Sequence, residues 1–253
     1  MQGIWQKDAG ILAVERCILT YRAQAKSLGA LLHEEDEVLA IVPSKDGVEV
    51  RARSGAYSTA RVVVCAGAWA GRLLADLKLP LIVARQPMGF YRPLDRELFE
   101  RGRFPLFLMD VTGQGGAGTN FYGFPYFGLD CMKVAHHGGG EAVTPESVDR
   151  SFNSADDKLL RDFLLRYIPK AAGPLQLGKI CLYTNTPDGD FILDRHPAHQ
   201  KLIVAAGFSG HGFKFSSAIG EIMADLALNG ATRHPIGRFK LARFPSDRGR
   251  GPT

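Results

Sequence analysis

Two apolar runs, each leading through a glycine turn into a helical segment, constrain the fold of this chain most strongly. The first is ARVVVCAG, residues 60–67, before AWAGRLLADL; the second is KLIVAAG, residues 201–207, before FSGHG and FKFSSAIGEIMADLALNG. A strand that is apolar throughout is typical of a parallel sheet covered on both faces. Strand, glycine turn and helix in that order are typical of a dinucleotide-binding fold. We therefore expect α/β structure in both parts of the chain.

Further elements are expected before the first of these runs. A helical stripe predicts a helix over residues 12–28, which Gly29 ends; its members are Val14, Ile18, Tyr21, Ala25 and Leu28. Short strands are expected in ALLH, VLAIV and VEVRARS, the last after the Asp46-Gly47 turn. In the last third, a helix over FKFSSAIGEIMADLALNG is expected to end at Asn229-Gly230.

The middle of the chain, from about Pro80 to Tyr183, has a different character. Its expected strands are rich in aromatic residues: PMGFYRPL, PLFLMDV, NFYGFPYFG and CMKVAHH. One helix, PESVDRSFNSADDKLLRDFLLRYI with Pro145 near its start, interrupts them. These segments predict a separate antiparallel layer beside the parallel sheet, and the fold class is mixed α/β (α+β).

Gly113, Gly115 and Gly118 match the dinucleotide pattern Gly-x-Gly-x-x-Gly by letter. The pattern holds a pyrophosphate only where a helix begins directly after it, because the helix N-terminus supplies the N–H groups and the positive dipole end. Here the strand NFYGFPYFG follows. We therefore interpret this stretch as a hairpin loop and not as a cofactor site.

The FSGHG turn is better placed, because it lies between a buried strand and a helix start. Gly207, Gly210 and Gly212 accompany His211 and Lys214 there, so the turn favours a ligand with an anionic group.

Two further segments carry reactive side chains. Cys181, between Ile180 and Leu182, is by itself typical of a buried small hydrophobe. Period-2 alternation places Lys133 and His137 on one face of the CMKVAHH strand. From the residues alone, these two either line a cleft or extend from an edge strand into solvent.

Composition excludes several classes. The chain has 253 residues, 45% of them hydrophobic, and a formal net charge of +5. Its four cysteines lie far apart without metal-ligand spacing, so we expect no metal and no disulfide framework. We expect neither a membrane span nor a signal peptide, and no nucleic-acid partner for the basic C-terminal segment. The expected location is the cytoplasm.

The combination of these segments resembles the monomeric sarcosine oxidase and N-methyl-tryptophan oxidase family, flavoenzymes that oxidise secondary amino acids. The resemblance rests on GKICLYTNTPDGDFILDRHP and LIVAAGFSGHGFKFSSAIGEIMADLAL, and it extends through VVVCAGAWAGRLL and NFYGFPYFGLDCMKVAHH. It implies a partial FAD-binding Rossmann-like domain over residues 11–82 and 187–253. It also implies an antiparallel substrate domain over residues 83–186.

The resemblance also implies roles for individual residues. Cys181 aligns with the cysteine that holds FAD covalently through a thioether to the flavin 8α-methyl, and Lys133 with a lysine that promotes the reaction with oxygen. Lys214 aligns with a partner of the substrate carboxylate, and Tyr122 and His137 with substrate-pocket residues. The remaining implied cofactor contacts are Val38, Cys65, Gly67, Gly210, His211, Gly212 and Phe213.

The implied reaction is hydride transfer from the carbon beside a secondary amine to the flavin, hydrolysis of the imine, and reduction of oxygen to hydrogen peroxide. Its partners are a small amino acid and oxygen, and the complete enzyme is expected to be a monomer.

This sequence departs from the family in lacking a counterpart to about its first third, which holds the pyrophosphate loop. That loop is expected upstream of Met1. Three interpretations stay open: a flavin oxidase that acts together with that segment, a dehydrogenase of the same fold, and a non-catalytic fragment.

Overall fold

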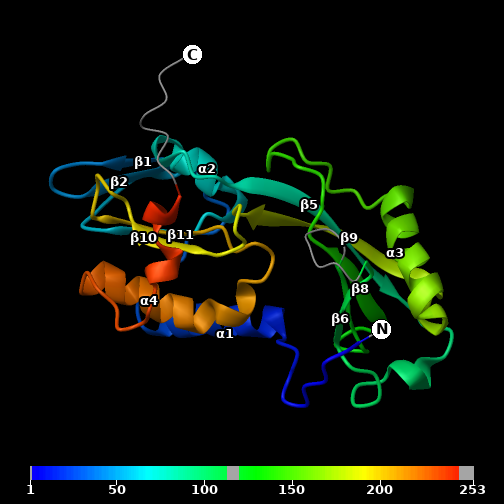
Figure 1. Cartoon of the computed structure of the whole chain (residues 1–253). Helices are drawn as coiled ribbons and strands as arrows, with labels where there is room; N and C mark the ends of the chain where they lie inside the picture. Colours follow the sequence, from blue (N-terminus) through cyan, green and yellow to red (C-terminus); the bar gives the residue numbers. More distant parts are fainter. Residues whose placement is uncertain (1, 113–119, 245–253) are drawn as a thin grey trace. The chain divides into compact units, whose positions relative to one another are not determined.

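The computed structural model describes residues 2–112 and 120–244, which fold as two compact units (Figure 1). Unit 1 combines Met1–Leu28 with Ala84–Leu182, and unit 2 combines Gly29–Val83 with Tyr183–Thr253. Both contain strands as well as helices, so the predicted mixed α/β fold class is confirmed. Among the described residues, no helix is both long and apolar enough to cross a membrane.

Unit 1 is built on a five-stranded sheet in the order β6-β7-β8-β5-β9. The strands are β5 (Ile82–Tyr91), β6 (Phe107–Asp110), β7 (Asn120–Phe124), β8 (Met132–His137) and β9 (Leu175–Asn185). β6 pairs with β7, β7 with β8, and β8 with β5, each antiparallel. The predicted antiparallel layer is therefore confirmed, and β9 is a strand that the sequence analysis did not predict.

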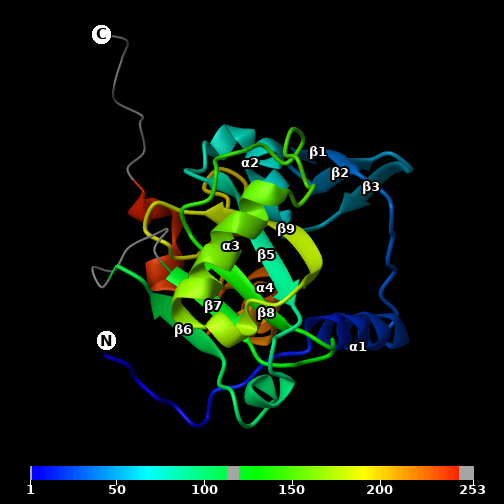
Figure 2. The ribbon, with the colours of Figure 1, turned by 90° about the vertical axis from the view of Figure 1, so that its right-hand side faces the viewer.

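Helix α3 (Ser154–Tyr167) covers one face of this sheet, as Figure 2 shows. Its buried residues pack with alternate residues of the strands in one core, whose members include Tyr91, Phe121, Met132, Leu160 and Phe163. The rings of Phe121 and Phe163 are stacked with their centroids 4.3 Å apart. Because side chains alternate along a strand, the neighbours of these core residues point to the other face.

The expected start of this helix near Pro145 was wrong. α3 begins at Ser154 because Asn153 caps it: the Asn153 side chain accepts from the N–H groups of Ala155 and Asp156, and the Asp156 side chain accepts from the Asn153 N–H. This capping box satisfies the first orphan N–H groups of the helix and fixes its first turn.

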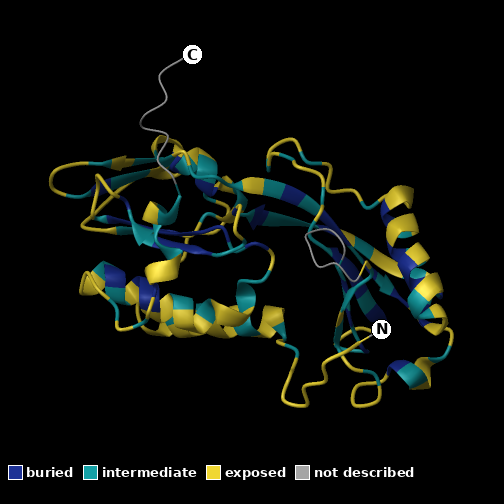
Figure 3. Cartoon of the chain, in the orientation of Figure 1, coloured by how far each residue is buried: buried dark blue, intermediate teal, exposed yellow. Residues whose placement is uncertain are grey.

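Helix α1 (Val14–Ser27) confirms the predicted N-terminal helix, but none of its residues is buried (Figure 3). Val14, Ile18 and Tyr21 of the predicted stripe are all exposed. The predicted strand ALLH was wrong: residues 30–33 form no strand, because no neighbouring strand in the described part of the chain accepts their hydrogen bonds.

Unit 2 contains two small sheets. The first is an antiparallel meander of β1 (Val38–Pro43), β2 (Val48–Ala52) and β3 (Gly55–Thr59). The second has the order β10-β11-β4, with β4 (Val62–Val64), β10 (Ile192–Arg195) and β11 (Leu202–Ala206). β4 and β11 run parallel, as the two apolar runs predicted.

Both faces of the second sheet are packed. Helix α4 (Ser216–Leu228) lies over one face through its buried residues Ile222, Met223 and Leu226. Ala70 and Leu74 pack on the other face. The helix expected over AWAGRLLADL is broken into η1 (Gly67–Trp69), α2 (Ala70–Leu73) and η2 (Ala75–Leu77), because Leu74 leaves helical geometry with its side chain buried in this core.

Five further short 3-10 segments lie in the described chain: η3 (Arg96–Phe99), η4 (Pro169–Ala171), η5 (Phe213–Phe215), η6 (Gly237–Phe239) and η7 (Leu241–Arg243). Of these, η5 directly precedes α4.

Candidate functional site

The sheet face of unit 1 opposite to α3 collects Tyr122, Lys133 and His137. In the register of β7 and β8, Tyr122 lies opposite Ala135, and Phe124 lies opposite Lys133. Lys133, Ala135 and His137 alternate with the core residues Met132 and Val134, so they point away from α3. The period-2 prediction for CMKVAHH is therefore confirmed.

Lys133 is half-buried between two aromatic rings. Its Nζ lies 5.2 Å from the ring centroid of Tyr122 and 5.1 Å from that of Phe124. The negative faces of aromatic rings attract an ammonium at this distance. β8 lies between β7 and β5, so the alternative of a lysine extending from an edge strand was wrong.

His137 contacts the same tyrosine. Its ring centroid lies 6.2 Å from that of Tyr122, with the two rings nearly perpendicular at 84°. Tyr122 therefore lies between a cation and an imidazole, and all three side chains are half-buried. This arrangement presents one positive charge and two groups capable of hydrogen bonding on a single surface.

Cys181 lies on β9 as a free, half-buried thiol. Burial raises its pKa, while the positive charges of Lys133, Lys179 and Arg150 act in the opposite direction, Lys133 most strongly. The neighbouring residue Ile180 is buried, whereas Cys181 is not. Cys181 is therefore only partly buried, which differs from the buried small hydrophobe that its neighbours alone predict, and the positive charge of Lys133 acts on its thiol.

The FSGHG turn in unit 2 connects β11 to α4 as predicted. Gly207 and Gly210 have positive φ values of 65° and 75°, and Ser209 between them has a φ of 47°. A Cβ added at Gly210 would lie 2.2 Å from a ring carbon of Tyr183. Position 210 therefore requires glycine both for its backbone conformation and for close contact with this ring.

The helix after this turn starts later than predicted. α4 begins at Ser216, and the preceding Phe213–Phe215 form a 3-10 turn. Lys214 is exposed, and its Nζ donates to the His211 carbonyl at 3.0 Å. A nitrogen of the His211 ring, Nε2, lies 3.1 Å from the Gly189 carbonyl. The hydrogen bonds of His211 and Lys214 thus hold the turn itself.

Val38, Cys65 and Gly67 also lie in unit 2. Val38 is the first residue of β1, and Cys65, which is exposed, directly follows β4. Gly67 begins η1 with a φ of 52°, and a Cβ there would meet open space. Because β4 and β11 are parallel, Cys65 to Gly67 and the FSGHG turn both follow the carboxyl ends of their strands, on the side of the sheet where α/β folds bind ligands.

The described residues would suit the flavin ring of FAD better than its pyrophosphate. A thiol, a lysine and aromatic rings suit a flavin ring, and the turn after β11 offers backbone at a helix start. The GQGGAG stretch with Gly113, Gly115 and Gly118 lies outside the described residues. The strands on either side of it, β6 and β7, pair antiparallel from Asp110 and Asn120. Within the described residues, no Gly-x-Gly-x-x-Gly turn precedes a helix.

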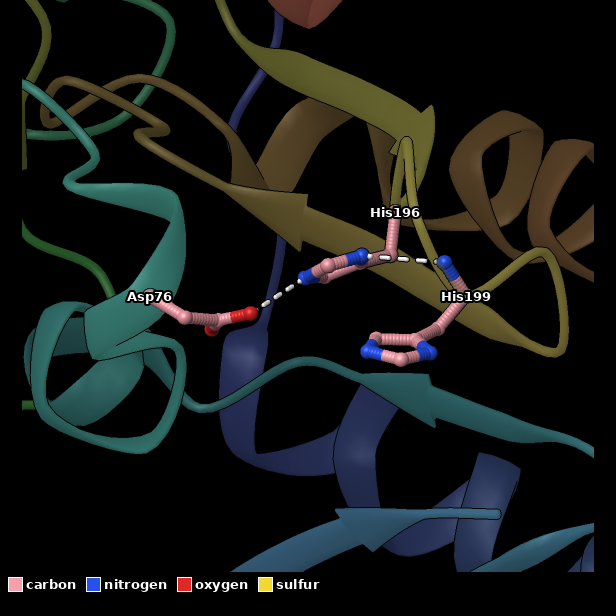
Figure 4. Close-up of side chains that lie close together, drawn as sticks. All are labelled: Asp76, His196 and His199. Atoms are coloured by element: carbon pink, nitrogen blue, oxygen red, sulfur yellow. Dashed lines mark hydrogen bonds and ion pairs between the residues drawn. The ribbon is translucent and has the colours of Figure 1, made fainter. Parts of the chain in front are cut away.

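A separate cluster in unit 2 has the composition of a metal site. Ligand atoms of Asp76, His196 and His199 lie within 4.8 Å of one another (Figure 4). The N–H groups of Ala198 and His199 both donate to His196 Nδ1 at 3.2 Å. The ring proton therefore lies on Nε2, which donates to Asp76 at 2.8 Å and has no lone pair for a metal. The hydrogen bonds of His196 therefore stabilise the turn over residues 196–199 and link it to Asp76.

Sequence reasoning missed three contributors. Phe124 stands opposite Lys133, and the period-2 register of two strands would have identified it. Lys179 alternates with Cys181 on β9, so recognising that strand would have placed it on the same face. The contact of Tyr183 with Gly210 joins segments that are far apart in the sequence, and no local pattern signals it.

Comparisons with known proteins agree with this architecture. Residues 1–226 match the family model described as FAD dependent oxidoreductase. The monomeric sarcosine oxidase of Bacillus sp. (strain NS-129) is 37% identical over 246 residues, which are 96% of this chain and 62% of that relative. The N-methyl-L-tryptophan oxidase of Escherichia coli is 34% identical over 244 residues, 96% of this chain and 63% of the relative.

Solved structures have the same fold at lower identity. L-proline dehydrogenase from P. horikoshii superimposes with a TM-score of 0.74 at 23% identity, covering 90% of this chain and 59% of that one. Glycine oxidase from Geobacillus kaustophilus gives 0.72 at 23% identity, covering 88% and 56%. The chain thus spans less than two thirds of the length of these proteins and of the two relatives.

Proposed function

Because the chain belongs to the FAD-dependent oxidoreductase family, we propose that it forms part of an enzyme that oxidises a secondary amino acid to an imine and reduces oxygen to hydrogen peroxide. The observation that carries this proposal is the surface of Tyr122, Lys133 and His137 on one face of the unit 1 sheet, with the charge of Lys133 acting on the Cys181 thiol of β9. The activity also requires the part of the relatives' length that this chain does not match.

The two parts of the fold have separate tasks in this proposal. Residues 11–82 and 187–253 belong to the FAD-binding domain, and residues 83–186 form the substrate domain. The parallel strands β4 and β11 and their glycine turns support the first assignment. Bound FAD supplies the redox chemistry by accepting a hydride from the carbon beside the substrate nitrogen, and the chain's residues bind, orient and provide charge.

Cys181 is the proposed attachment point of the cofactor. Its Sγ would form a thioether with the flavin 8α-methyl carbon. The thiol S–H bond and one methyl C–H bond would break, both protons would leave, and the two electrons would reduce the flavin, which oxygen would reoxidise. The thiolate is the reactive form of a cysteine. Lys133, whose charge opposes the effect of burial on the Cys181 pKa, supports that form.

Lys133 has a second task, which favours an oxidase over a dehydrogenase. A fixed ammonium stabilises the negative charge that develops on oxygen as it is reduced. The rings of Tyr122 and Phe124 hold this ammonium in place on the sheet face.

The substrate is proposed to bind through three side chains. Tyr122 and His137 are proposed to hydrogen-bond to the substrate, and Lys214 is proposed to pair with its carboxylate. Lys214 is exposed and donates to a backbone carbonyl, so its ammonium keeps further donor capacity. The backbone of Gly210 to Phe213, with Val38, Cys65 and Gly67, completes the proposed cofactor contacts. All four cysteines are free, which supports a cytoplasmic enzyme, and we propose a monomer.

The test is to produce this chain together with the part of the Bacillus sp. NS-129 sarcosine oxidase that it does not match. We expect flavin fluorescence to stay with the denatured chain, and the Cys181→Ser variant to lose it. Oxygen uptake is then measured with sarcosine, N-methyl-tryptophan, proline and pipecolate. Flavin that washes away from the denatured wild-type chain would refute the Cys181 assignment.

A parallel measurement addresses the electron acceptor. The Lys133→Met variant is expected to reduce an artificial dye at the wild-type rate with the same substrate, while its oxygen uptake falls at least about tenfold. Lys158→Met, on the outer surface of α3, is the matched control. Equal oxygen rates in all three proteins would leave the dehydrogenase as the better interpretation.

A further inference from the structure

A pocket beside β10 in unit 2 is not used by the proposed chemistry. It has a volume of about 1440 Å³ and is lined by residues of η2, of the end of β10, of the segment after α4 and of η7; we call it the β10 pocket. Much of its wall is apolar and includes Leu79, Pro187, Leu226, Ile236 and Phe244. Small-molecule sites combine an apolar wall of this kind with a few polar groups. The polar groups of the β10 pocket therefore indicate what it could bind.

The β10 pocket lies away from the proposed cofactor contacts of unit 2. β10 is an edge strand in the order β10-β11-β4 and runs antiparallel to β11. Arg195, at the end of β10, lies opposite Ile203 near the start of β11, whereas Ile192 lies opposite Ala206, just before the FSGHG turn. A ligand beside Arg195 would therefore leave that turn free.

Arg195 lines the pocket with a guanidinium that has no acceptor. The residue is half-buried and its Nη2 is fully buried, yet within residues 2–112 and 120–244 no group accepts a hydrogen bond from this side chain. Three other half-buried arginines, Arg85, Arg161 and Arg243, each pair with an aspartate. A charge that is removed from water is costly unless an opposite charge compensates it. Arg195 thus lacks the compensation that these arginines have.

The two carboxylates that line the pocket are already engaged. Asp194 accepts from Lys240 Nζ at 2.9 Å, and Asp76 accepts from His196 Nε2 at 2.8 Å. Neither interacts with the guanidinium of Arg195. The counter-charge for Arg195 therefore has to come from a bound group.

A structural role as a cap of α4 does not account for this arginine. Its Nη2 lies against Gly230, where an added Cβ would be 2.3 Å away, so it is close to the carboxyl end of the helix. That end supplies only a partial negative charge. None of the carbonyls in the described part of the chain accepts from the guanidinium.

Lys78 brings a second positive charge to the pocket. It is exposed and forms no ion pair with any residue that the structure describes. Its backbone is left-handed, with φ 45° and ψ 48°, which is uncommon for a residue other than glycine. Such conformations persist where the surrounding structure holds them, often at ligand sites. Both uncompensated charges of the pocket are therefore positive.

We propose that the β10 pocket binds an organic anion whose carboxylate or phosphate group pairs with Arg195 and whose apolar body lies against Ile236 and Phe244. The planar guanidinium can donate two parallel hydrogen bonds to either group. The apolar body is part of the proposal because burying it removes both its own surface and the pocket wall from water. The site does not involve FAD, so the proposal is independent of the proposed function.

The experiment is isothermal titration of the full chain with decanoate and with decyl phosphate, both below their micelle concentrations. Decanol keeps the apolar body without the charge, and inorganic phosphate keeps the charge without the body. We expect each of these two controls to bind at least about tenfold more weakly than the matching anion. Tighter binding of decanoate or of decyl phosphate identifies the preferred group, and either result supports the proposal.

Three variants assign the binding to Arg195. Arg195→Gln removes the charge and is expected to weaken decanoate binding at least about tenfold, while Arg195→Lys, which keeps the charge but not the planar fork, should bind with intermediate affinity. Arg233→Gln is the matched control, because Arg233 is an exposed arginine of the same unit that pairs with Glu221. It is expected to bind decanoate as the wild type does.

A measurement on the wild-type chain keeps the test valid if Arg195→Gln does not fold, which circular dichroism checks. In an NMR titration with decanoate, the Nε–H resonance of Arg195 should shift and that of Arg233 should not. Three results would each overturn the proposal: equal decanoate affinity in the wild type and a folded Arg195→Gln variant, decanol binding as tight as decanoate binding, and an Arg195 resonance that does not move.

Discussion

The ammonium of Lys133 lies over the ring of Tyr122, with Nζ 5.2 Å from the ring centroid, and the same charge lowers the pKa of Cys181 against the effect of burial. These three side chains come from three strands of one sheet. A single fixed cation thereby influences a thiol and a phenol that are 59 residues apart in sequence. The first prediction uses this coupling.

The Lys133→Met variant is expected to raise the Cys181 pKa further, since it removes the positive charge that favours the thiolate most. The thiolate is the form that reacts with iodoacetamide. In a flavin-free preparation at pH 8, alkylation of Cys181 should therefore slow by a factor of roughly two or more, because a smaller fraction of the thiol is ionised. Mass spectrometry resolves Cys181 from the other cysteines.

Two matched variants calibrate this measurement. Lys179→Met should slow alkylation less, because Lys179 is exposed and affects the Cys181 pKa more weakly than Lys133 does. Lys158→Met, on an exposed ion pair of α3, should leave the rate unchanged. Equal rates for Lys133→Met and Lys158→Met would show that the Lys133 charge does not act on Cys181.

Asp156 provides a prediction about stability. Its carboxylate accepts from the Asn153 N–H in the cap of α3 and also pairs with Arg85, and both side chains of this ion pair are almost completely buried. Arg85 Nη1 and Nη2 donate to its two carboxylate oxygens at 2.6 and 2.8 Å, with side-chain exposures of 11% and 8% for Arg85 and Asp156. Asp156→Asn leaves the guanidinium without its counter-charge and is expected to cost about 3 kcal/mol of unfolding free energy. Urea unfolding at pH 7 measures it.

Asp162→Asn on the same helix is the control. Asp162 pairs with Lys158 at the surface, where both side chains are more than half exposed. Its removal should change the unfolding free energy by less than about 0.5 kcal/mol. A comparable loss in the two variants would mean that burial does not distinguish the two pairs.

Local patterns predicted much of this fold. The uninterrupted apolar runs gave the correct parallel pairing of β4 and β11, and alternation in CMKVAHH placed Lys133 and His137 on the right face. Both results depend only on the periodicity of a strand. The same periodicity would have placed Phe124, had the register of β7 and β8 been known.

The failures have a common physical origin in contacts between distant segments. The start of α3 is set by the Asn153 capping box, in which Asp156 also holds Arg85 from β5. The helical spacing of apolar residues before Asn153 predicted a longer helix and did not reveal that these contacts fix the helix start at Ser154. Likewise, Leu74 ends α2 because it is buried against strands that follow more than a hundred residues later.

His196 provides a prediction about metals. Its Nδ1 accepts two backbone N–H groups and its Nε2 donates to Asp76, so a metal would have to displace the Nε2 proton. Stoichiometric Zn²⁺ is therefore expected to leave the midpoint of thermal unfolding unchanged. His196→Leu removes the hydrogen bonds that this buried imidazole makes to Asp76 and to the Ala198 N–H, and it should cost about 1 kcal/mol. The exposed His199→Leu should cost under about 0.5 kcal/mol. Stabilisation by Zn²⁺ that both variants abolish would instead identify a metal site.

The Asp188–Arg243 pair predicts a dependence of stability on pH. Arg243 Nε donates to Asp188 at 2.7 Å and Nη2 at 3.2 Å, and this guanidinium lowers the pKa of Asp188 to about 2 from an ordinary value of 3.8. A carboxylate whose pKa is lower in the folded state stabilises that state above the unfolded value. The contribution is thus complete above pH 3.8 and disappears as the pH falls to about 2.

Asp188→Asn should therefore destabilise the chain by roughly 1 kcal/mol at pH 7, since the 39% exposure of Asp188 leaves the pair partly screened by solvent. The difference from wild type should shrink between pH 4 and pH 2, as measured by urea unfolding at each pH. Asp46→Asn, in an exposed turn of the same unit, is the control and should differ from wild type by less than about 0.5 kcal/mol throughout. If the Asp188→Asn difference were the same at pH 2 and pH 7, its cause would be lost packing and not charge, because only the charge is titrated in that interval.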